Sequence, residues 1–105
     1  MSRWTLVACA VVLAACAGPK PEVESVRVER VENGKALVTV AVRNRGGGDG
    51  QATVAVTLRD GAGTVVGQDE LDVDLQPHER VKVAREIAVA AAKDVVAEAE
   101  ARYPP

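Results

Sequence analysis

The feature that most constrains this chain is a repeated alternation, at a period of two, of aliphatic residues with polar or small ones. Five runs show it, at residues 26–28, 38–42, 54–58, 71–75 and 81–83. Successive side chains of a β-strand point to opposite faces, so each run predicts a strand with one buried and one solvated face. Strands of this kind are typical of antiparallel sheets.

Turn-forming residues separate these runs. Asn33-Gly34 is a two-residue hairpin sequence, and the glycine-rich residues 46–50 predict a flexible loop. Residues 60–63 close a further hairpin, and residues 76–79 break the next connection at a proline. Strands at this spacing predict an all-β fold, an immunoglobulin-like antiparallel β-sandwich of about seven strands after an N-terminal signal helix.

The C-terminal stretch, residues 87–102, is compatible with two structures. It is rich in Ala, Glu and Lys, which are good helix formers, and several of its apolar residues recur at helical spacing. From Val95 to Tyr103, apolar residues also alternate with mostly polar ones. We favour a final strand, because a sandwich needs one there to cover its core.

The first residues have the composition of an export signal. Arg3 gives a positive start, and residues 4–17 form an uncharged, mostly apolar run. This run is shorter than the about 20 residues that a membrane-spanning helix needs, but long enough for the core of a signal peptide. We expect a signal peptide over residues 1–15, a lipidated tether over residues 16–22 and one sandwich domain over residues 23–105.

The leader ends in Leu13-Ala14-Ala15-Cys16, which resembles the bacterial lipobox. In that family the Cys thiol receives a diacylglyceryl group, a peptidase cleaves just before the Cys, and the new amino terminus is acylated. The resemblance implies that Cys16 is lipidated and that the lipid anchors the protein in a membrane. The other cysteine, Cys9, also ends such a motif, but cleavage there would leave too short an apolar core.

The residue after Cys16 bears on the target membrane. It is Ala17 rather than Asp. By resemblance to enterobacterial sorting, this favours the outer membrane, with the protein on its periplasmic face.

Composition limits what the domain can enclose or bind. Beyond residue 15, Val, Leu and Ile supply 22 residues, 17 of them Val, and Tyr103 is the only aromatic. We expect so thin a core to leave no enclosed pocket for a small-molecule substrate. The same part of the chain has 12 basic and 15 acidic residues with the signs interspersed, so no basic face suggests nucleic acid.

No constellation of residues predicts catalysis, a cofactor or a metal. His78 is the only histidine, and Ser25 is the only serine beyond the leader, so a serine triad would depend on these two alone. No second His or Cys completes a zinc site. The densest acidic group comprises Asp69, Glu70, Asp72 and Asp74. We interpret it as a solvated strand face that resists aggregation, with weak calcium binding as the alternative.

Three short segments match known turn-and-strand motifs. They are Val40-Ala41-Val42-Arg43-Asn44, Val56-Thr57-Leu58-Arg59-Asp60-Gly61 and Leu75-Gln76-Pro77-His78-Glu79. The first is similar to a strand that ends in Asn before a glycine loop. The second is similar to an F-x-L-Y-D segment that lacks both aromatics, and the third to an L-x-P-G-E turn with His78 in place of Gly. On these segments, residues 38–87 resemble the FxLYD and CARDB-type immunoglobulin-like domains of bacterial envelope proteins, which implies the sandwich fold and no catalytic residues.

These observations predict a lipid-anchored cell-envelope module with a structural or protein-binding role and no catalysis. The alternative is an accessory subunit of a larger envelope complex, such as a secretion or cell-wall assembly. We expect an envelope protein partner to bind an exposed edge strand or the loops. Arg43 and Arg45, which flank the glycine-rich loop, are the candidate contact residues.

Overall fold

The computed structural model describes residues 18–90 and 94–105 of the chain. The expected signal helix and the lipobox with Cys16 lie outside the described residues. The described part forms six strands: β1 (Pro21–Glu32), β2 (Lys35–Asn44), β3 (Gly50–Arg59), β4 (Val65–Leu75), β5 (Arg80–Ala88) and β6 (Val96–Arg102). Within it, no helix is long and apolar enough to span a bilayer.

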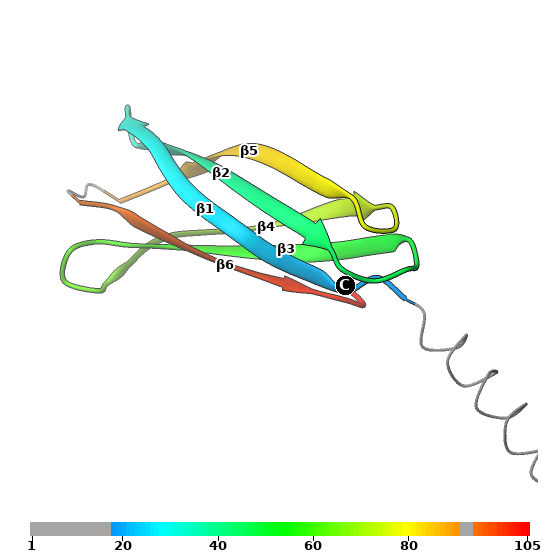
Figure 1. The fold of residues 1–105 in the computed structure, drawn as a ribbon. Helices are drawn as coiled ribbons and strands as arrows, with labels where there is room; N and C mark the ends of the chain where they lie inside the picture. Colours follow the sequence, from blue (N-terminus) through cyan, green and yellow to red (C-terminus); the bar gives the residue numbers. More distant parts are fainter. Residues whose placement is uncertain (1–17, 91–93) are drawn as a thin grey trace, which may run out of the picture.

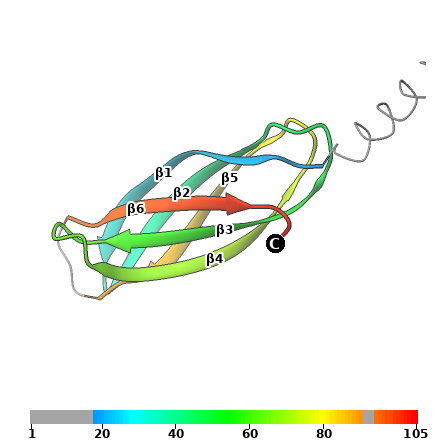
Figure 2. The same cartoon turned by 90° about the horizontal axis from the view of Figure 1, so that it is seen from below.

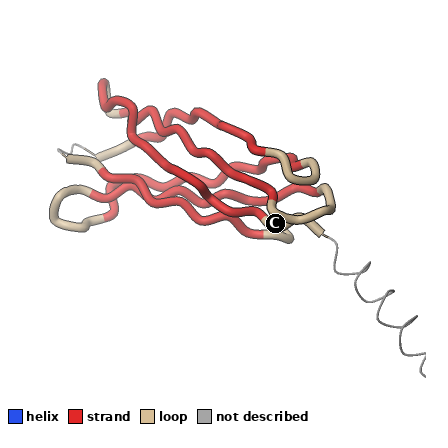
Figure 3. Tube along the Cα trace, in the orientation of Figure 1, coloured by secondary structure: helices blue, strands red, loops and turns tan. Residues whose placement is uncertain are grey.

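The strands form two antiparallel sheets that pack face to face (Figure 1, Figure 2). One sheet has the order β1-β2-β5 and the other the order β4-β3-β6, and strands account for most of the described chain (Figure 3). This architecture confirms the predicted all-β sandwich, and β6 confirms a final strand rather than a helix. The described part has six strands, where about seven were predicted.

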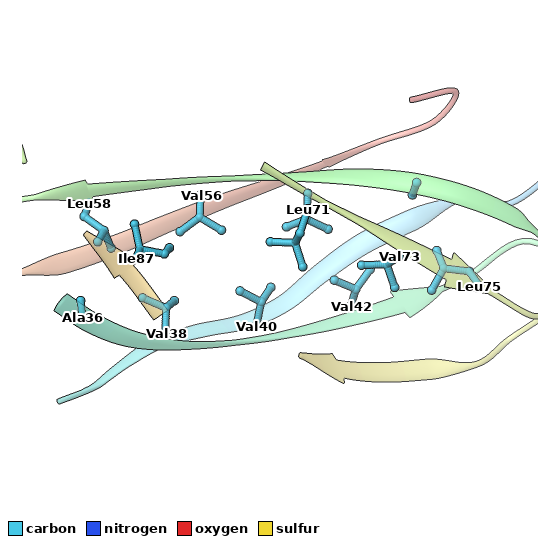
Figure 4. Close-up of a cluster of buried hydrophobic side chains, with 12 residues drawn as sticks. Ala36, Val38, Val40, Val42, Val56, Leu58, Leu71, Val73, Leu75 and Ile87 are labelled. Carbon is cyan, nitrogen blue, oxygen red and sulfur yellow. The ribbon is translucent and has the colours of Figure 1, made fainter. Parts of the chain in front are cut away.

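The core lies between the central strands β2 and β3 and is entirely aliphatic (Figure 4). Alternate residues of both strands are buried, from Ala36 to Val42 in β2 and from Ala52 to Leu58 in β3. The cluster is completed by Leu71, Val73, Leu75 and Ile87. Burying one Val or Leu side chain contributes about 1.5–3 kcal/mol before conformational entropy is counted. The buried face of each central strand is the one that the alternation predicts.

β1 and β6 lie against each other and close one long side of the sandwich. β1 packs Val23, Val26 and Val28 against the core, whereas Val31 is exposed. Its pairing with β2 has two irregularities, between Val23 and Ser25 and between Val28 and Arg30. A bulge adds one residue to a strand, so inward valines on β1 are separated by three residues as well as by two. β6 contributes small side chains, and Ala97, Ala99 and Ala101 pack against the core.

The opposite long side, between β4 and β5, carries a pair of charges on the inner face. The strand register places Arg85 opposite buried Val38 and Asp69 opposite buried Val56. Arg85 Nε lies 2.8 Å from Asp69 Oδ2, which joins the two sheets by an ion pair. Inward-pointing charges at the edge of a sheet oppose pairing with a further strand. This side of the sandwich is therefore protected against strand addition.

Candidate functional site at the base of the sandwich

Four segments meet at one end of the sandwich, which we call the base: residues 18–20, 45–50, 76–79 and 103–105. β1, β3 and β5 begin at this end, and β2, β4 and β6 finish there. Figure 1 shows the C-terminus beside the start of β1. The base is also the end from which the chain leads back toward Cys16.

Asn44, the last residue of β2, is fully buried and organises the base through four hydrogen bonds. Its Oδ1 accepts from the backbone N–H groups of Lys20 and Gly46, both at 2.9 Å. Its Nδ2 donates to the carbonyl oxygens of Gly48, at 2.8 Å, and Gln76, at 2.9 Å. One side chain thereby satisfies backbone groups of three segments that are distant in the sequence.

The sequence predicts no role for Asn44, although a local pattern points to it. Asn side chains commonly bond the backbone of a nearby turn, and Asn44 stands between a buried strand and the glycine-rich loop. That pattern explains the bonds to Gly46 and Gly48. The bonds to Lys20 and Gln76 are visible only once the strands are assembled, because both partners come from other parts of the chain.

The glycine-rich loop, residues 46–50, is tied to its neighbours, which differs from the predicted flexible loop. The carbonyl oxygen of Gly46 accepts a hydrogen bond from the backbone N–H of His78 at 3.3 Å, in addition to the bonds with Asn44. A Cβ added at Gly46 would collide with the carbonyl oxygen of Gly18. Glycine is therefore required here because two backbone segments approach closely.

Residues 18–22, predicted as part of a tether, belong to the folded body. Pro19 is buried, and the carbonyl oxygen of Lys20 accepts a hydrogen bond from the backbone N–H of Arg45 at 2.9 Å. β1 already begins at Pro21, a residue type that the first position of a strand tolerates because its missing N–H is not needed there. The folded domain thus begins before residue 23.

Tyr103 covers the base close to the start of the described chain. A Cβ added at Gly50 would lie 3.0 Å from its Cε1, and one added at Gly18 would lie 3.5 Å from its Cε2. Tyr103 nevertheless remains 46% exposed. The only aromatic residue beyond the leader therefore lies at the base with much of its surface in solvent.

Arg43 and Arg45, the candidate contact residues, both face carboxylates of β1. Arg45 Nε lies 2.7 Å from Glu22 Oε2, and Arg43 Nη1 lies 3.9 Å from Glu24 Oε2. Arg80 Nε binds the same Glu24 at 2.6 Å. The positive charge expected beside the loop is thus compensated by acidic neighbours, while both arginines stay accessible.

The residues considered for catalysis lie in different elements. Ser25 is exposed on β1, and His78 is exposed in the turn between β4 and β5. His78 has a φ of 61°, in the left-handed region that glycine adopts without strain. His78 occupies the position of the Gly in the L-x-P-G-E turn, so the backbone of this turn explains why that motif has a glycine there. Among residues 18–90 and 94–105, no group of three His, Cys, Asp or Glu side chains is placed to hold a metal ion.

The acidic group lies on β4, at the edge of its sheet. Asp72 and Asp74 point outward together, as the alternation predicts. Asp72 Oδ1 accepts a hydrogen bond from Thr53 Oγ1 at 2.9 Å, and Glu70 Oε2 lies 2.8 Å from Arg102 Nη2. Asp72 and Glu70 are thus engaged by neighbouring side chains of the same sheet.

The outer face of this sheet has a shallow depression that is open to solvent. Ala55 and Thr57 of β3 line it, with Glu70 of β4 and Arg102 of β6 beside them. The small side chains of the central strand leave this space between longer side chains of the two edge strands. It is a groove on a sheet face and not an enclosed pocket.

Comparisons with known proteins extend only to the fold. No family model matches the chain, and no curated protein matches it. A glycosyl hydrolase family 2 member from Bacteroides cellulosilyticus DSM 14838 is 15% identical with a TM-score of 0.53, over 83% of this chain and 13% of that chain. A β-glucuronidase from glycoside hydrolase family 2 is 20% identical with a TM-score of 0.48, over 70% of this chain and 7% of that chain. The chain thus spans a small part of the length of either protein.

Proposed function

We propose that the protein is a lipid-anchored cell-envelope module with a structural or protein-binding role and no catalysis. The observation that carries this proposal is the lipobox-like Leu13-Ala14-Ala15-Cys16 at the end of an apolar leader, followed almost at once by a β-sandwich. An accessory subunit of a larger envelope complex is the alternative form of the same role. The sandwich likeness supports a modular part, because the match covers only 13% of the larger hydrolase chain.

The anchor would form on Cys16 in successive steps. The thiol displaces the phosphate headgroup of a phospholipid donor, so that a thioether to diacylglycerol forms and the thiol proton leaves with the headgroup. A peptidase then hydrolyses the Ala15–Cys16 peptide bond. The freed amine displaces a lysophospholipid from a second phospholipid, so that an amide forms and the amine proton leaves with the lysophospholipid. Several acyl chains anchor a protein stably, whereas one gives only marginal binding. Ala17 supports the outer membrane as the destination, with the domain on its periplasmic face.

The described surface favours binding through loops over the addition of a strand. The bulges of β1 disrupt one edge, and the Arg85–Asp69 ion pair occupies the side between β4 and β5. The hairpins opposite the base, at residues 33–34 and 60–63, are exposed except for the partly buried Asp60. Of the two modes expected from the sequence, we therefore favour loop contacts with an envelope partner.

Metabolic labelling tests the anchor. Cells that express the full chain with Cys16→Ser are expected to show no palmitate on the protein and no partitioning into the detergent phase. Cys9→Ser is the matched control, because it removes the other cysteine of the leader and should leave labelling intact. Palmitate on the Cys16→Ser protein would contradict the proposal, and membrane fractionation of the wild type tests the outer-membrane assignment.

A pull-down from detergent-solubilised envelope tests the contact residues. Arg43→Glu with Arg45→Glu is expected to lower partner recovery more than Asp72→Lys with Asp74→Lys. All four side chains lie outside the hydrophobic core, so both double variants should fold. Equal recovery, or a greater loss from the acidic-strand variant, would remove Arg43 and Arg45 as contacts.

A further inference from the structure

The base is joined to the proposed lipid by a very short link. Only Ala17 separates Cys16 from Gly18, the first described residue. Consecutive Cα atoms are about 3.8 Å apart, so the Cα atoms of Cys16 and Gly18 can be separated by no more than about 7.6 Å. The headgroup layer on each side of a bilayer is about 5–8 Å thick. Acyl chains on Cys16 therefore bring the base to the headgroups.

The segment that follows this link is fixed to the body of the sandwich. The N–H of Lys20 donates to Asn44 Oδ1, and its carbonyl oxygen accepts from the N–H of Arg45, each at 2.9 Å. Pro19 is buried beside Gly50. Lifting the base from the membrane would require these contacts to break, so the body follows Cys16 instead of hanging from a long tether.

The surface of the base suits a lipid interface. In the four segments of the base, only Lys20, Arg45, Asp49 and Glu79 have side chains with a formal charge at pH 7, and Arg45 pairs with Glu22. Glycine, proline and Tyr103 supply much of the rest. Tyr is enriched where membranes meet water, because its ring is apolar and its hydroxyl is polar.

We propose that the base rests directly on the phospholipid headgroups, with Tyr103 in the interface and the opposite end directed away from the membrane. This inference depends on the proposed lipidation of Cys16, and it adds an orientation and a contact surface that an anchor alone does not require. The occupant of the surface is the bilayer itself. The hairpins at residues 33–34 and 60–63 would then point away from the bilayer, and a protein partner that uses Arg43 and Arg45 would contact the sandwich beside the base, where these arginines pair with β1.

The emission of Tyr103 tests this arrangement without an added label. The mature lipoprotein is reconstituted into phosphatidylcholine vesicles with or without a nitroxide on the lipid headgroup. Quenching by the nitroxide is expected to remove most of the Tyr103 emission. The control Tyr103→Phe with Ala62→Tyr moves the reporter to the opposite end, about 30 Å away along ten residues of β3, and should keep its emission.

A second variant distinguishes a base that is held at the headgroups from a base that moves freely above them. Ten Gly and Ser residues inserted between Ala17 and Gly18 give the body a reach of about 17 Å, and the quenching of Tyr103 should fall. Equal quenching of Tyr103 and of the tyrosine at position 62 would contradict the proposed contact between the base and the headgroups. Quenching of Tyr103 that does not change with the spacer would contradict it as well. Mass spectrometry of the same samples reports the lipid on Cys16. An unlipidated protein would contradict both the proposed function and the contact of the base with the headgroups. A lipidated protein with unquenched Tyr103 would contradict that contact alone.

Discussion

The base and the opposite end of the sandwich use similar chemistry in different surroundings. At the base, the amide of Asn44 bonds four backbone groups while fully buried. At the opposite end, which we call the tip, Asp60 Oδ1 accepts from the backbone N–H groups of Ala62 and Thr64 at 2.9 and 3.0 Å in a hairpin that faces solvent. Both side chains organise loops, but only one of them is shielded from water.

The difference shows how burial sets the energetic weight of a polar contact. A buried donor or acceptor left without a partner costs about 1–3 kcal/mol, because water cannot replace the lost bond. An exposed group is rehydrated, so its hydrogen bond contributes a net of only about 0.5–1.5 kcal/mol. The base should therefore tolerate little change, and the tip should tolerate much more. The following variants test this contrast on residues 17–105 produced without the leader.

The largest effect is expected from Asn44→Ala. The change leaves backbone groups of Lys20, Gly46, Gly48 and Gln76 without their side-chain partner, so the free energy of unfolding should fall by at least about 3 kcal/mol. Urea unfolding followed by far-ultraviolet circular dichroism measures this loss. A loss no greater than that of the tip variant Asp60→Ala would contradict the claim that the base is more sensitive to substitution than the tip.

Gly46→Ala should have the next largest effect. Its Cβ would collide with the carbonyl oxygen of Gly18, and overpacking of this kind costs about 1–3 kcal/mol. Gly47→Ala is a matched control in the same loop, because a Cβ there meets nothing within 4 Å. The two variants are compared by their midpoints of urea unfolding. Equal midpoints would show that the loop and residues 18–20 can move apart without loss of stability.

Asp60→Ala should cost about 1 kcal/mol, because both of its side-chain hydrogen bonds are exposed to water. Thermal unfolding detects a change of this size, at about 4–8 °C per kcal/mol for a domain of this length. A loss above that of Gly46→Ala would mean that the tip, and not the base, is the sensitive end.

The smallest effect is expected at the surface ion pairs, where the two ends should no longer differ. Arg45–Glu22 at the base and Arg59–Glu98 near the tip both have N···O distances of 2.7 Å with exposed side chains. Double-mutant cycles should give a coupling of about 0.5 kcal/mol for each pair, reduced by added salt. A coupling several times larger at the base would show that its surroundings strengthen exposed charges as well.

Much of the fold could be predicted from the sequence because its strongest pattern is local. In β2, β3 and the second half of β4, every second side chain is buried, as the period of two requires. The pattern was less informative in β1, where bulges interrupt the period between Val23 and Ser25 and between Val28 and Arg30. It was ambiguous in β6, since a strand of alanines and glutamates has the composition of a helix and becomes a strand by pairing with β3.

The candidate site was harder to predict because its parts come from separate segments. The lipobox-like segment is contiguous, so lipidation of Cys16 could be proposed from the sequence alone, as could a contact role for Arg43 and Arg45 beside the loop. The carboxylates that face these arginines lie on β1, and only strand pairing brings them close. Arg85 shares the inward phase of Val83 and Ile87, but its partner Asp69 belongs to the other sheet.

The sequence by itself determined that this chain forms antiparallel strands around a thin aliphatic core, and it carries the lipobox-like segment on which the proposed anchor rests. These properties depend on neighbouring residues, because alternation sets which face is buried and a motif is read along the chain. Only the tertiary structure decided that residues 18–22 join the folded body and that Asn44 holds the base together. Asn44 meets Lys20 and Gln76 at sequence separations of 24 and 32 residues, and such contacts arise only when sheet pairing brings distant segments together.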